Sequence, residues 1–250
     1  MARARIGKLD VDVLTFADAV HAITALVENQ RGGRIFTPNV DHVVLAETDE
    51  RVRQAYARAT LSLADGTPVV WASRIRGPRL PARISGSDLI TPLMAIAGQR
   101  QWRVYLLGGT DGVASQVAQL MAEQHGVTVV GVDEPRIAYA TADEESLAVA
   151  RVVASRPDLL FVALGSPKQE LFIDRVRDQL GTIVAIGVGA SFDFLAGRVR
   201  RAPAWISTMG LEWLYRLVKE PRRLWRRYLV QDSKFVFVLL RMLRERDTRA

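Results

Sequence analysis

A single carboxylate, Asp65, stands where a short apolar segment meets a turn. Residues 60–63 have the composition of a strand, and the Asp-Gly and Thr-Pro pairs that follow are typical of a turn. An apolar run that suits a helix, Val69 to Ser73, comes next. Catalytic groups of open α/β proteins gather at the carboxyl ends of strands, so Asp65 is a candidate catalytic residue. The alternative is that Asp65 only caps the turn or the following helix.

A glycine-rich turn, residues 108–112, separates an expected strand at residues 102–107 from an expected helix. Such a turn can bind phosphate, because free backbone N–H groups and the dipole of the helix both favour an anion. Gly108 and Gly109 are therefore candidate nucleotide-binding residues. The turn has neither the G-x-G-x-x-G spacing of dinucleotide sites nor the Gly-Lys-Ser/Thr of a P-loop, so it favours neither NAD nor ATP.

Basic residues gather in the last fifth of the chain. The 250 residues carry a formal net charge of +7; residues 197–250 contain 14 Lys and Arg against 5 Asp and Glu, and the rest contains 20 against 22. This asymmetry indicates a polyanionic partner, which could be nucleic acid, an anionic membrane or a diphosphate. Arg216, Arg223 and Arg226 are spaced so that they could face one ligand, provided that one helix continues through Pro221.

Apolar side chains accompany these arginines. Residues 235–243 contain one non-apolar residue, Arg241, and they are too few for the roughly 20 residues that cross a bilayer. The run suits an interfacial helix beside anionic lipid. The alternatives are that the arginines form a solvated face, that the last helix packs on the sheet or on a second subunit, and that the aromatic residues belong to the core, namely Trp213, Trp225 and Tyr228.

Composition excludes several classes of site. The chain has no cysteine, which excludes disulfides and thiolate metal sites. His21, His42 and His125 are far apart and lack metal-ligand spacing, and the Gly-x-Ser-x-Gly elbow of a serine hydrolase is missing. Nucleic acid is the weaker partner, since the aromatic residues lie apart from the arginines and no DNA- or RNA-binding motif occurs. The N-terminal residues lack the apolar region of a signal peptide, so we expect a cytoplasmic protein.

Strand-like and helix-like segments alternate over the first 196 residues. Several strand-like segments are continuous apolar runs, which is typical of a mostly parallel sheet covered by helices on both faces. One long helix is expected near residues 43–59, and a loop rich in Arg, Pro and Gly near residues 74–85. We therefore predict a Rossmann-like α/β domain over residues 1–196 and a basic helical, membrane-associating appendage over residues 197–250.

One carboxylate, a glycine-rich turn and many arginines fit the displacement of a diphosphate leaving group without a metal. In such a reaction, cationic side chains stabilise the negative charge of the departing diphosphate, a role that a divalent metal ion has in other enzymes. The residues leave two other functions open. One is a non-catalytic nucleotide-binding scaffold that docks on membrane or nucleic acid through its basic tail. The other is a dinucleotide-dependent oxidoreductase, against which the spacing of Gly109 and Gly112 argues.

A series of short blocks runs through the chain from about Thr37 to Arg227. They are Thr37-Pro38-Asn39, Ala64-Asp65-Gly66 with Trp71 following, Gly86-Ser87-Asp88-Leu89, Leu107-Gly108-Gly109, GSPKQE at 165–170, GVGA at 187–190 leading to Phe192-Asp193, and RAP at 201–203 before GLEWLYR at 210–216. The last two blocks and the Pro-Lys-Gln-Glu run are the specific ones. Through these residues the sequence resembles the WecG/TagA/CpsF family of bacterial glycosyltransferases over nearly its whole length.

The resemblance implies an inverting transferase that moves a sugar from a UDP-sugar to a polyprenyl-diphosphate-linked glycan. The donor it implies is UDP-N-acetylmannosamine, its uronic acid or another hexose, and it implies no metal and no cofactor. Asp65 corresponds to the proposed base. The other corresponding residues are Thr37, Asn39, Arg83 and Gln169 for the acceptor and the pocket, and Arg216, Arg223 and Arg226 for the UDP diphosphate.

The resemblance also implies where the protein works and with what. The expected place is the inner face of the cell membrane, with the protein bound peripherally and its product entering teichoic acid linkage units, enterobacterial-type antigens or exopolysaccharides. The expected partners are the UDP-sugar, the lipid-linked acceptor and the membrane surface, and no nucleic acid. A homo-oligomer stays open as an alternative.

Overall fold

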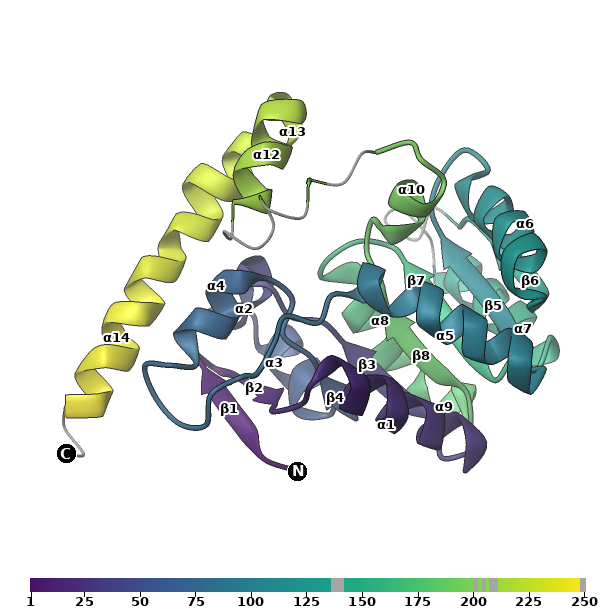
Figure 1. Ribbon diagram of the computed structural model, residues 1–250, viewed down its shortest axis with the longest axis horizontal. Coiled ribbons are helices and arrows are strands. Elements are labelled where there is room, and N and C mark those ends of the chain that lie inside the picture. Colours follow the sequence, from purple (N-terminus) through teal and green to yellow (C-terminus); the bar gives the residue numbers. More distant parts are fainter. Residues whose placement is uncertain (136–141, 200–201, 204–205, 207–210, 248–250) are drawn as a thin grey trace.

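The computed structural model describes residues 1–135, 142–199, 202–203, 206 and 211–247, and a parallel sheet lies at its centre. Among the described residues the sheet has six strands, all parallel, in the order β4-β3-β8-β7-β5-β6 (Figure 1). The strands are β3 (Gly33–Phe36), β4 (Leu61–Ser62), β5 (Arg103–Gly108), β6 (Thr128–Asp133), β7 (Leu159–Ala163) and β8 (Val184–Gly187). The predicted α/β class with a mostly parallel sheet is confirmed.

Successive residues of each strand point to opposite faces of the sheet, so each face has its own hydrophobic core. In β3, Phe36 packs in one core and Ile35 in the other. The Ile35 core is covered by α1 (Phe16–Glu28), α5 (Gly86–Arg100), α6 (Val113–His125) and α10 (Ser191–Leu195). The Phe36 core is covered by α2 (Val40–Ala46), α3 (Glu50–Ala57), α4 (Thr67–Ala72), α7 (Ala142–Ala154), α8 (Lys168–Arg175) and α9 (Arg177–Leu180).

One local expectation from the sequence is wrong, and the sequence-based prediction misses one strand. The single helix expected near residues 43–59 is two helices, α2 and α3, because the Asp49 side chain accepts the backbone N–H of Arg51 and starts a new helix. The N-terminal residues form a strand, β1 (Arg3–Ile6), which pairs with β2 (Leu9–Asp12) in an antiparallel hairpin. The sequence-based prediction lacks β1, although alternation of exposed and buried residues is typical of a half-buried strand.

Helices α5 and α6 pack closely at Gly98, and we expect Gly98→Ala to destabilise the fold. Alanine normally stabilises a helix interior relative to glycine, but a Cβ at this position would lie 1.9 Å from the carbonyl oxygen of His125. Overpacking of this kind should lower the free energy of unfolding by about 1–3 kcal/mol. Thermal unfolding of Gly98→Ala beside the exposed neighbour Gln99→Ala measures the effect, and equal melting temperatures would contradict it.

The C-terminal segment is a broken series of helices rather than one helix. Its parts are α12 (Glu212–Lys219), α13 (Pro221–Trp225), a π-helical turn (Arg226–Gln231), a 3₁₀ turn (Asp232–Lys234) and α14 (Phe235–Asp247). The backbone of Glu220, at φ −130° and ψ 57°, is not helical, and Pro221 begins a new helix. The continuous helix through Pro221 that would align Arg216 with Arg223 is therefore not formed. The side chains of these two arginines lie outside the described residues.

Helix α14 packs against the rest of the protein along α2 and the β1–β2 hairpin (Figure 1). Phe235, Val238 and Met242 on its inner side are buried. The Arg241 guanidinium contacts both oxygens of the Glu47 carboxylate at 2.7 Å, so an ion pair adds to the apolar contact. Of the helices that the structure describes, none is both long enough and apolar enough to cross a membrane.

Candidate active site

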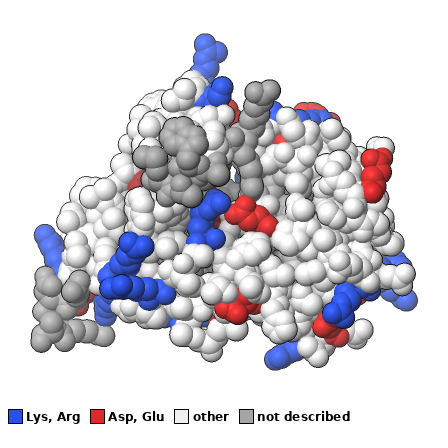
Figure 2. Space-filling view, in the orientation of Figure 1, with Lys and Arg blue, Asp and Glu red and all other residues white. Residues whose placement is uncertain are grey.

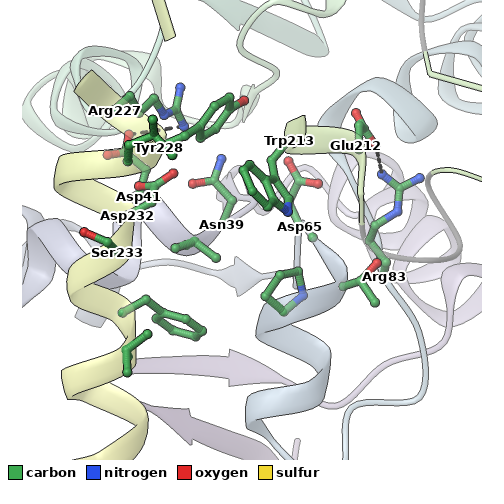
Figure 3. A pocket seen from close by; sticks show the side chains of 17 residues that line it. Asn39, Asp41, Asp65, Arg83, Glu212, Trp213, Arg227, Tyr228, Asp232 and Ser233 are labelled. Atoms are coloured by element: carbon green, nitrogen blue, oxygen red, sulfur yellow. Dashed lines mark hydrogen bonds and ion pairs between the residues drawn. The ribbon is translucent and has the colours of Figure 1, made fainter. Parts of the chain in front are cut away.

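A cavity of about 550 Å³ lies where the carboxyl ends of β3 and β4 face the C-terminal helices (Figure 3). Residues that follow β3 and β4 form one wall, and residues after 211 form the other. Its polar lining among the described residues includes Asn39, Asp41, Asp65, Arg83, Glu212, Arg227, Asp232 and Ser233, and its apolar lining includes Val40, Pro68, Trp213, Leu229, Phe235 and Val236. The cavity therefore joins two parts of the chain that are far apart in sequence.

Asp65 reaches this cavity because the chain stays fixed to its neighbours after β4. The backbone N–H of Asp65 donates to the carbonyl oxygen of Pro38 at 2.9 Å, and the carbonyl of Ala64 accepts from Ile84 at 2.7 Å. Gly66 follows with a φ of 105°, which residues with a side chain rarely adopt, and α4 begins directly after it. The Asp-Gly pair therefore turns the chain immediately after the carboxylate and leaves Asp65 on the cavity wall.

The surroundings of Asp65 make its carboxylate a stronger base than an exposed aspartate. Burial is the largest effect and raises the pKa of Asp65; the Arg83 guanidinium opposes this shift, and the carboxylates of Glu212 and Asp88 add to it. The pKa of Asp65 is raised to about 6. A carboxylate with this pKa is largely ionised at pH 7 and still has affinity for a proton, which suits a general base.

Arg83 connects the wall that carries Asp65 to the C-terminal helices. It lies in the predicted loop between α4 and α5. Its guanidinium contacts the Asp88 carboxylate at 3.0 Å and the Glu212 carboxylate at 3.3 Å (Figure 3). Asp88 belongs to the first turn of α5 and Glu212 to the first turn of α12, so Arg83 links these two helix starts beside Asp65.

A second group of charges lies on the other side of Asn39 from Asp65 (Figure 3). The Arg227 guanidinium contacts the Asp41 carboxylate at 3.2 Å. Burial, reinforced by the Asp41 charge, raises the pKa of Asp232 to about 6. Within the described part of the chain, no three His, Asp or Glu side chains are close enough together to hold a metal ion.

The C-terminal wall contains residues that the sequence does not identify as part of a site. The rings of Trp213 and Tyr228 meet edge to face with 6.1 Å between their centroids, and both side chains line the cavity. Aromatic residues inside a basic segment are a signal of a binding surface. The sequence leaves them equally compatible with a core position, because it does not reveal which surface the segment covers.

The structure brings three of the predicted site residues together, since Asp65, Asn39 and Arg83 all line the cavity. Thr37 and Gln169 are buried and are not part of its lining. Thr37 follows β3 directly, and a Cβ on Gly86 would lie 3.5 Å from its hydroxyl oxygen. The Gln169 side chain carbonyl accepts the backbone N–H of Gly189 at 2.9 Å, so it fixes the loop after β8.

Of the three predicted C-terminal arginines, only Arg226 has a described side chain, and it is not among the described residues that line the cavity. The Arg226 guanidinium lies over the Trp225 ring, 5.9 Å from its centroid, and the side chain is exposed. Arg216 and Arg223 belong to α12 and α13, but their side chains fall outside the described residues. Arg227, which the sequence places in the same basic run, is the one described arginine of that run on the cavity wall.

Gly108 and Gly109 lie at the carboxyl end of β5, at the same edge of the sheet. A Cβ on Gly108 would lie 2.4 Å from the carbonyl oxygen of Ala163, so the approach of β5 to β7 requires glycine. Helix α6 leaves β5 toward one face and α8 leaves β7 toward the other. Ligands of open α/β sheets commonly bind at such a switch point, and Gly108 and Gly109 lie there.

The N-terminus of α6 has an anionic partner within the chain. The Glu134 carboxylate accepts the backbone N–H of Gly112 at 2.8 Å and that of Ala114 at 2.9 Å. These are donors that the glycine-rich turn would offer to a phosphate. A phosphate bound by them would have to displace Glu134.

The chain is similar to known transferases along nearly its whole length. Residues 4–249 match the family described as the glycosyl transferase WecG/TagA/CpsF family. One relative, from Bacillus spizizenii (strain ATCC 23059 / NRRL B-14472 / W23), is named N-acetylglucosaminyldiphosphoundecaprenol N-acetyl-beta-D-mannosaminyltransferase; it is 34% identical over 238 residues, 94% of this chain and 90% of the relative. A relative of the same name from Bacillus subtilis (strain 168) is 31% identical over 223 residues, 89% of this chain and 84% of the relative. The chain therefore belongs to the WecG/TagA/CpsF family of glycosyl transferases.

Proposed function

We propose that the protein transfers an N-acetylmannosamine-type sugar, or a related hexose or uronic acid, from a UDP-sugar to a polyprenyl-diphosphate-linked glycan. The names of the two Bacillus relatives support the acceptor class and the transferred sugar. The observation that carries the proposal is the Asp65 carboxylate, whose pKa of about 6 suits a general base at the wall of a large cavity. The product would serve the synthesis of a cell-surface polysaccharide or teichoic acid.

In the proposed reaction, Asp65 accepts the proton of an acceptor hydroxyl while that oxygen attacks the anomeric carbon of the donor. The bond from the anomeric carbon to the UDP oxygen breaks on the opposite face, so the configuration inverts and UDP leaves with the electron pair. Asn39 and Arg83 line the same cavity and would hold the acceptor. Thr37 and Gln169 are buried, so we assign them the role of holding the backbone around the cavity.

The proposal needs no metal, because cationic side chains would stabilise the charge of the departing diphosphate. We assign this role to Arg216, Arg223 and Arg226, and we assign the nucleotide to the turn at Gly108 and Gly109. The position of the turn at the switch point between β5 and β7 supports this assignment.

We expect kcat/KM for transfer to fall below pH 6. Asp65 acts as a base only when its carboxylate is ionised, and its pKa is about 6. The rate should therefore decrease about tenfold for each unit of pH below this value and level off above about pH 7. A pH profile measured with subsaturating acceptor tests this expectation. A rate that is constant from about pH 5 to pH 7 would contradict Asp65 as the base.

A donor screen followed by a transfer assay tests the proposed function directly. The correct UDP-sugar should raise the melting temperature, because a ligand stabilises the folded state to which it binds. That donor should then be consumed when a short-chain polyprenyl-diphosphate glycan is added, with release of UDP. Nucleotide binding without transfer to any such acceptor would instead support the alternative function, a non-catalytic scaffold.

We propose in addition that residues 1–196 form the catalytic domain and that residues 197–250 attach it to the inner face of the cell membrane. Among the described residues, most exposed large apolar side chains belong to the segment 213–243, with Phe237 at 72% exposure. The flank formed by α14 carries few charged side chains along its length and basic ones toward its ends (Figure 2). An apolar strip between basic side chains is suited to anionic lipid.

The Phe237→Asp/Leu240→Asp double variant should lose binding to vesicles that contain anionic lipid. Burying two large apolar side chains contributes enough free energy that we expect a loss of at least about tenfold in partitioning. Flotation of the protein with vesicles measures the effect. Leu147→Asp on α7, which replaces an exposed leucine elsewhere, is the matched control. Unchanged flotation of the double variant would remove α14 from the membrane contact.

A further inference from the structure

A buried ion pair lies behind the cavity wall. His42 Nε2 is 3.2 Å from the Glu170 Oε1 atom, and the two side chains are 4% and 0% exposed. His42 belongs to α2 and Glu170 to α8, which cover the same face of the sheet. Neither side chain lines the cavity. The proposed reaction does not use either residue.

Stabilisation of the fold does not by itself explain a buried ion pair between His42 and Glu170. Taking two charges out of water is expensive, and a well-packed apolar pair is often at least as stable as a buried ion pair. The Glu170 Oε1 atom also accepts from the Gln169 Nε2 atom at 2.8 Å, whereas Glu170 Oε2 is buried without a hydrogen-bond partner.

The other ring nitrogen of His42 points toward the cavity residue Asn39. His42 Nδ1 is 2.9 Å from the Asn39 Oδ1 atom and 3.2 Å from the Asn39 backbone nitrogen. A charged imidazole can donate to Oδ1, while a neutral imidazole protonated at Nε2 can only accept the backbone N–H. The Asn39 Oδ1 atom also accepts the backbone N–H of His42 at 3.4 Å whatever the charge on the ring, and a charged ring adds a second, shorter hydrogen bond that fixes the amide.

The groups around His42 favour its charged form. Burial alone would lower the pKa of His42, but the Glu170 and Asp41 carboxylates outweigh burial and the opposing Arg227, so the pKa is raised. The titratable and charged groups that face the ring are Glu170 from α8, Asp41 from α2, Tyr56 from α3, Asp65 from the segment after β4, and Arg227 and Asp232 from the C-terminal segment. A charged ring leaves the Nδ2 group of Asn39 to act as a donor in the cavity.

We propose that His42 and Glu170 are positioning residues, whose ion pair holds the Asn39 amide so that its Nδ2 donors face an oxygen of the acceptor beside Asp65. This inference rests on the proposed transferase function. It predicts that the pair acts on acceptor binding and not on donor binding. It also predicts that the pair has no effect once the Asn39 amide is gone.

Glu170→Gln tests the proposal, because it keeps the size of the side chain but removes the charge that holds His42 protonated. We expect the acceptor KM at pH 6.5, the usual pKa of histidine, to rise about three- to tenfold, as for the loss of one hydrogen bond. The donor KM should change less than twofold. The rise of the acceptor KM with pH should also begin at a lower pH than in the unaltered protein. Glu123→Gln, an exposed glutamate on α6, is the matched control.

A double-mutant cycle separates positioning from a structural effect. Asn39→Ser removes the amide and keeps an oxygen that can cap α2. In the Asn39→Ser background, Glu170→Gln should change the acceptor KM less than twofold. An equal effect of Glu170→Gln in both backgrounds, or a lower melting temperature with an unchanged KM, would overturn the proposal. Failure of the unaltered protein to transfer any sugar would instead refute the proposed function.

Nuclear magnetic resonance of the full chain tests whether His42 positions the Asn39 amide, and it does so whether or not transfer activity is detected. The side-chain amide signal of Asn39 should move with pH in step with the ring nitrogens of His42. In Glu170→Gln both movements should shift to lower pH. If the chemical shift of the Asn39 side-chain amide stays constant while the His42 ring titrates, the inference is overturned.

Discussion

The Asp65→Asn variant should lose transfer by a factor of about 10²–10⁴ and become more stable at the same time. The loss is the usual contribution of a general base, since an amide cannot accept the proton of the acceptor hydroxyl. The gain follows from the pKa of Asp65, which is raised to about 6 mainly by burial. At pH 8 the folded chain therefore holds a charged carboxylate where the uncharged form is favoured.

The sign of the stability change depends on pH. Because the pKa is higher in the folded than in the unfolded chain, the ionised carboxylate destabilises the fold above about pH 6, by at most about 3 kcal/mol. Asp65→Asn should raise the melting temperature by roughly 2–8 °C at pH 8. The difference should shrink between about pH 6 and pH 4 and vanish below about pH 3, where Asp65 is protonated in both states.

Transfer assays and thermal unfolding on the same preparation check both halves of this result. Asp178→Asn, an exposed aspartate on α9, is the control and should alter neither quantity. Near-normal turnover of Asp65→Asn would remove Asp65 from the mechanism. A loss of activity together with a lower melting temperature would indicate a structural carboxylate instead.

Removal of all residues after Gly197 should abolish transfer and vesicle binding together. More than half of the described residues that line the cavity come from this segment. Glu212 and Arg227 would no longer face Arg83 and Asp41, so the cavity would lose one charged wall and its aromatic pair. The arginines assigned to the diphosphate would be lost as well.

The truncated chain should be compared with the full chain by circular dichroism, because it uncovers the surface beneath Phe235, Val238 and Met242. Retained helix and strand signals together with lost transfer are the expected result. A truncated chain that transfers sugar at a normal rate would show that residues 198–250 do not complete the site. Retained vesicle binding would place the membrane contact elsewhere.

The sequence predicts the sheet and the position of Asp65 because both depend on local patterns. Continuous apolar runs between helices define parallel strands. The Asp65-Gly66 pair marks the turn after β4, and Gly66 does have the positive φ that such a turn needs. The break between α2 and α3 is also local, but the capping of Arg51 by Asp49 is one of several compatible patterns within a long helical segment.

The C-terminal wall could not be predicted in the same way. Trp213 and Tyr228 line the cavity only because α14 packs along α2, and that contact depends on residues such as Glu47 and Arg241, which are far apart in sequence. The ion pair between His42 and Glu170 is equally remote. A sequence pattern records which face of a helix is apolar, and it does not record which distant helix will cover that face.

The two walls of the cavity differ in how freely they can change. Around Asp65 the backbone is fixed on both sides by hydrogen bonds to Pro38 and Ile84, so substitutions nearby disturb the sheet itself. On the facing wall, Leu229 and Val236 are about half exposed and do not belong to the hydrophobic core. We therefore expect their replacement to change the free energy of unfolding little. We therefore expect that new substrate preferences can accumulate on the C-terminal wall by single mutations while Asp65, the proposed base, stays in place on the other wall. The wall that tolerates substitution and the wall that carries Asp65 lie on opposite sides of one cavity.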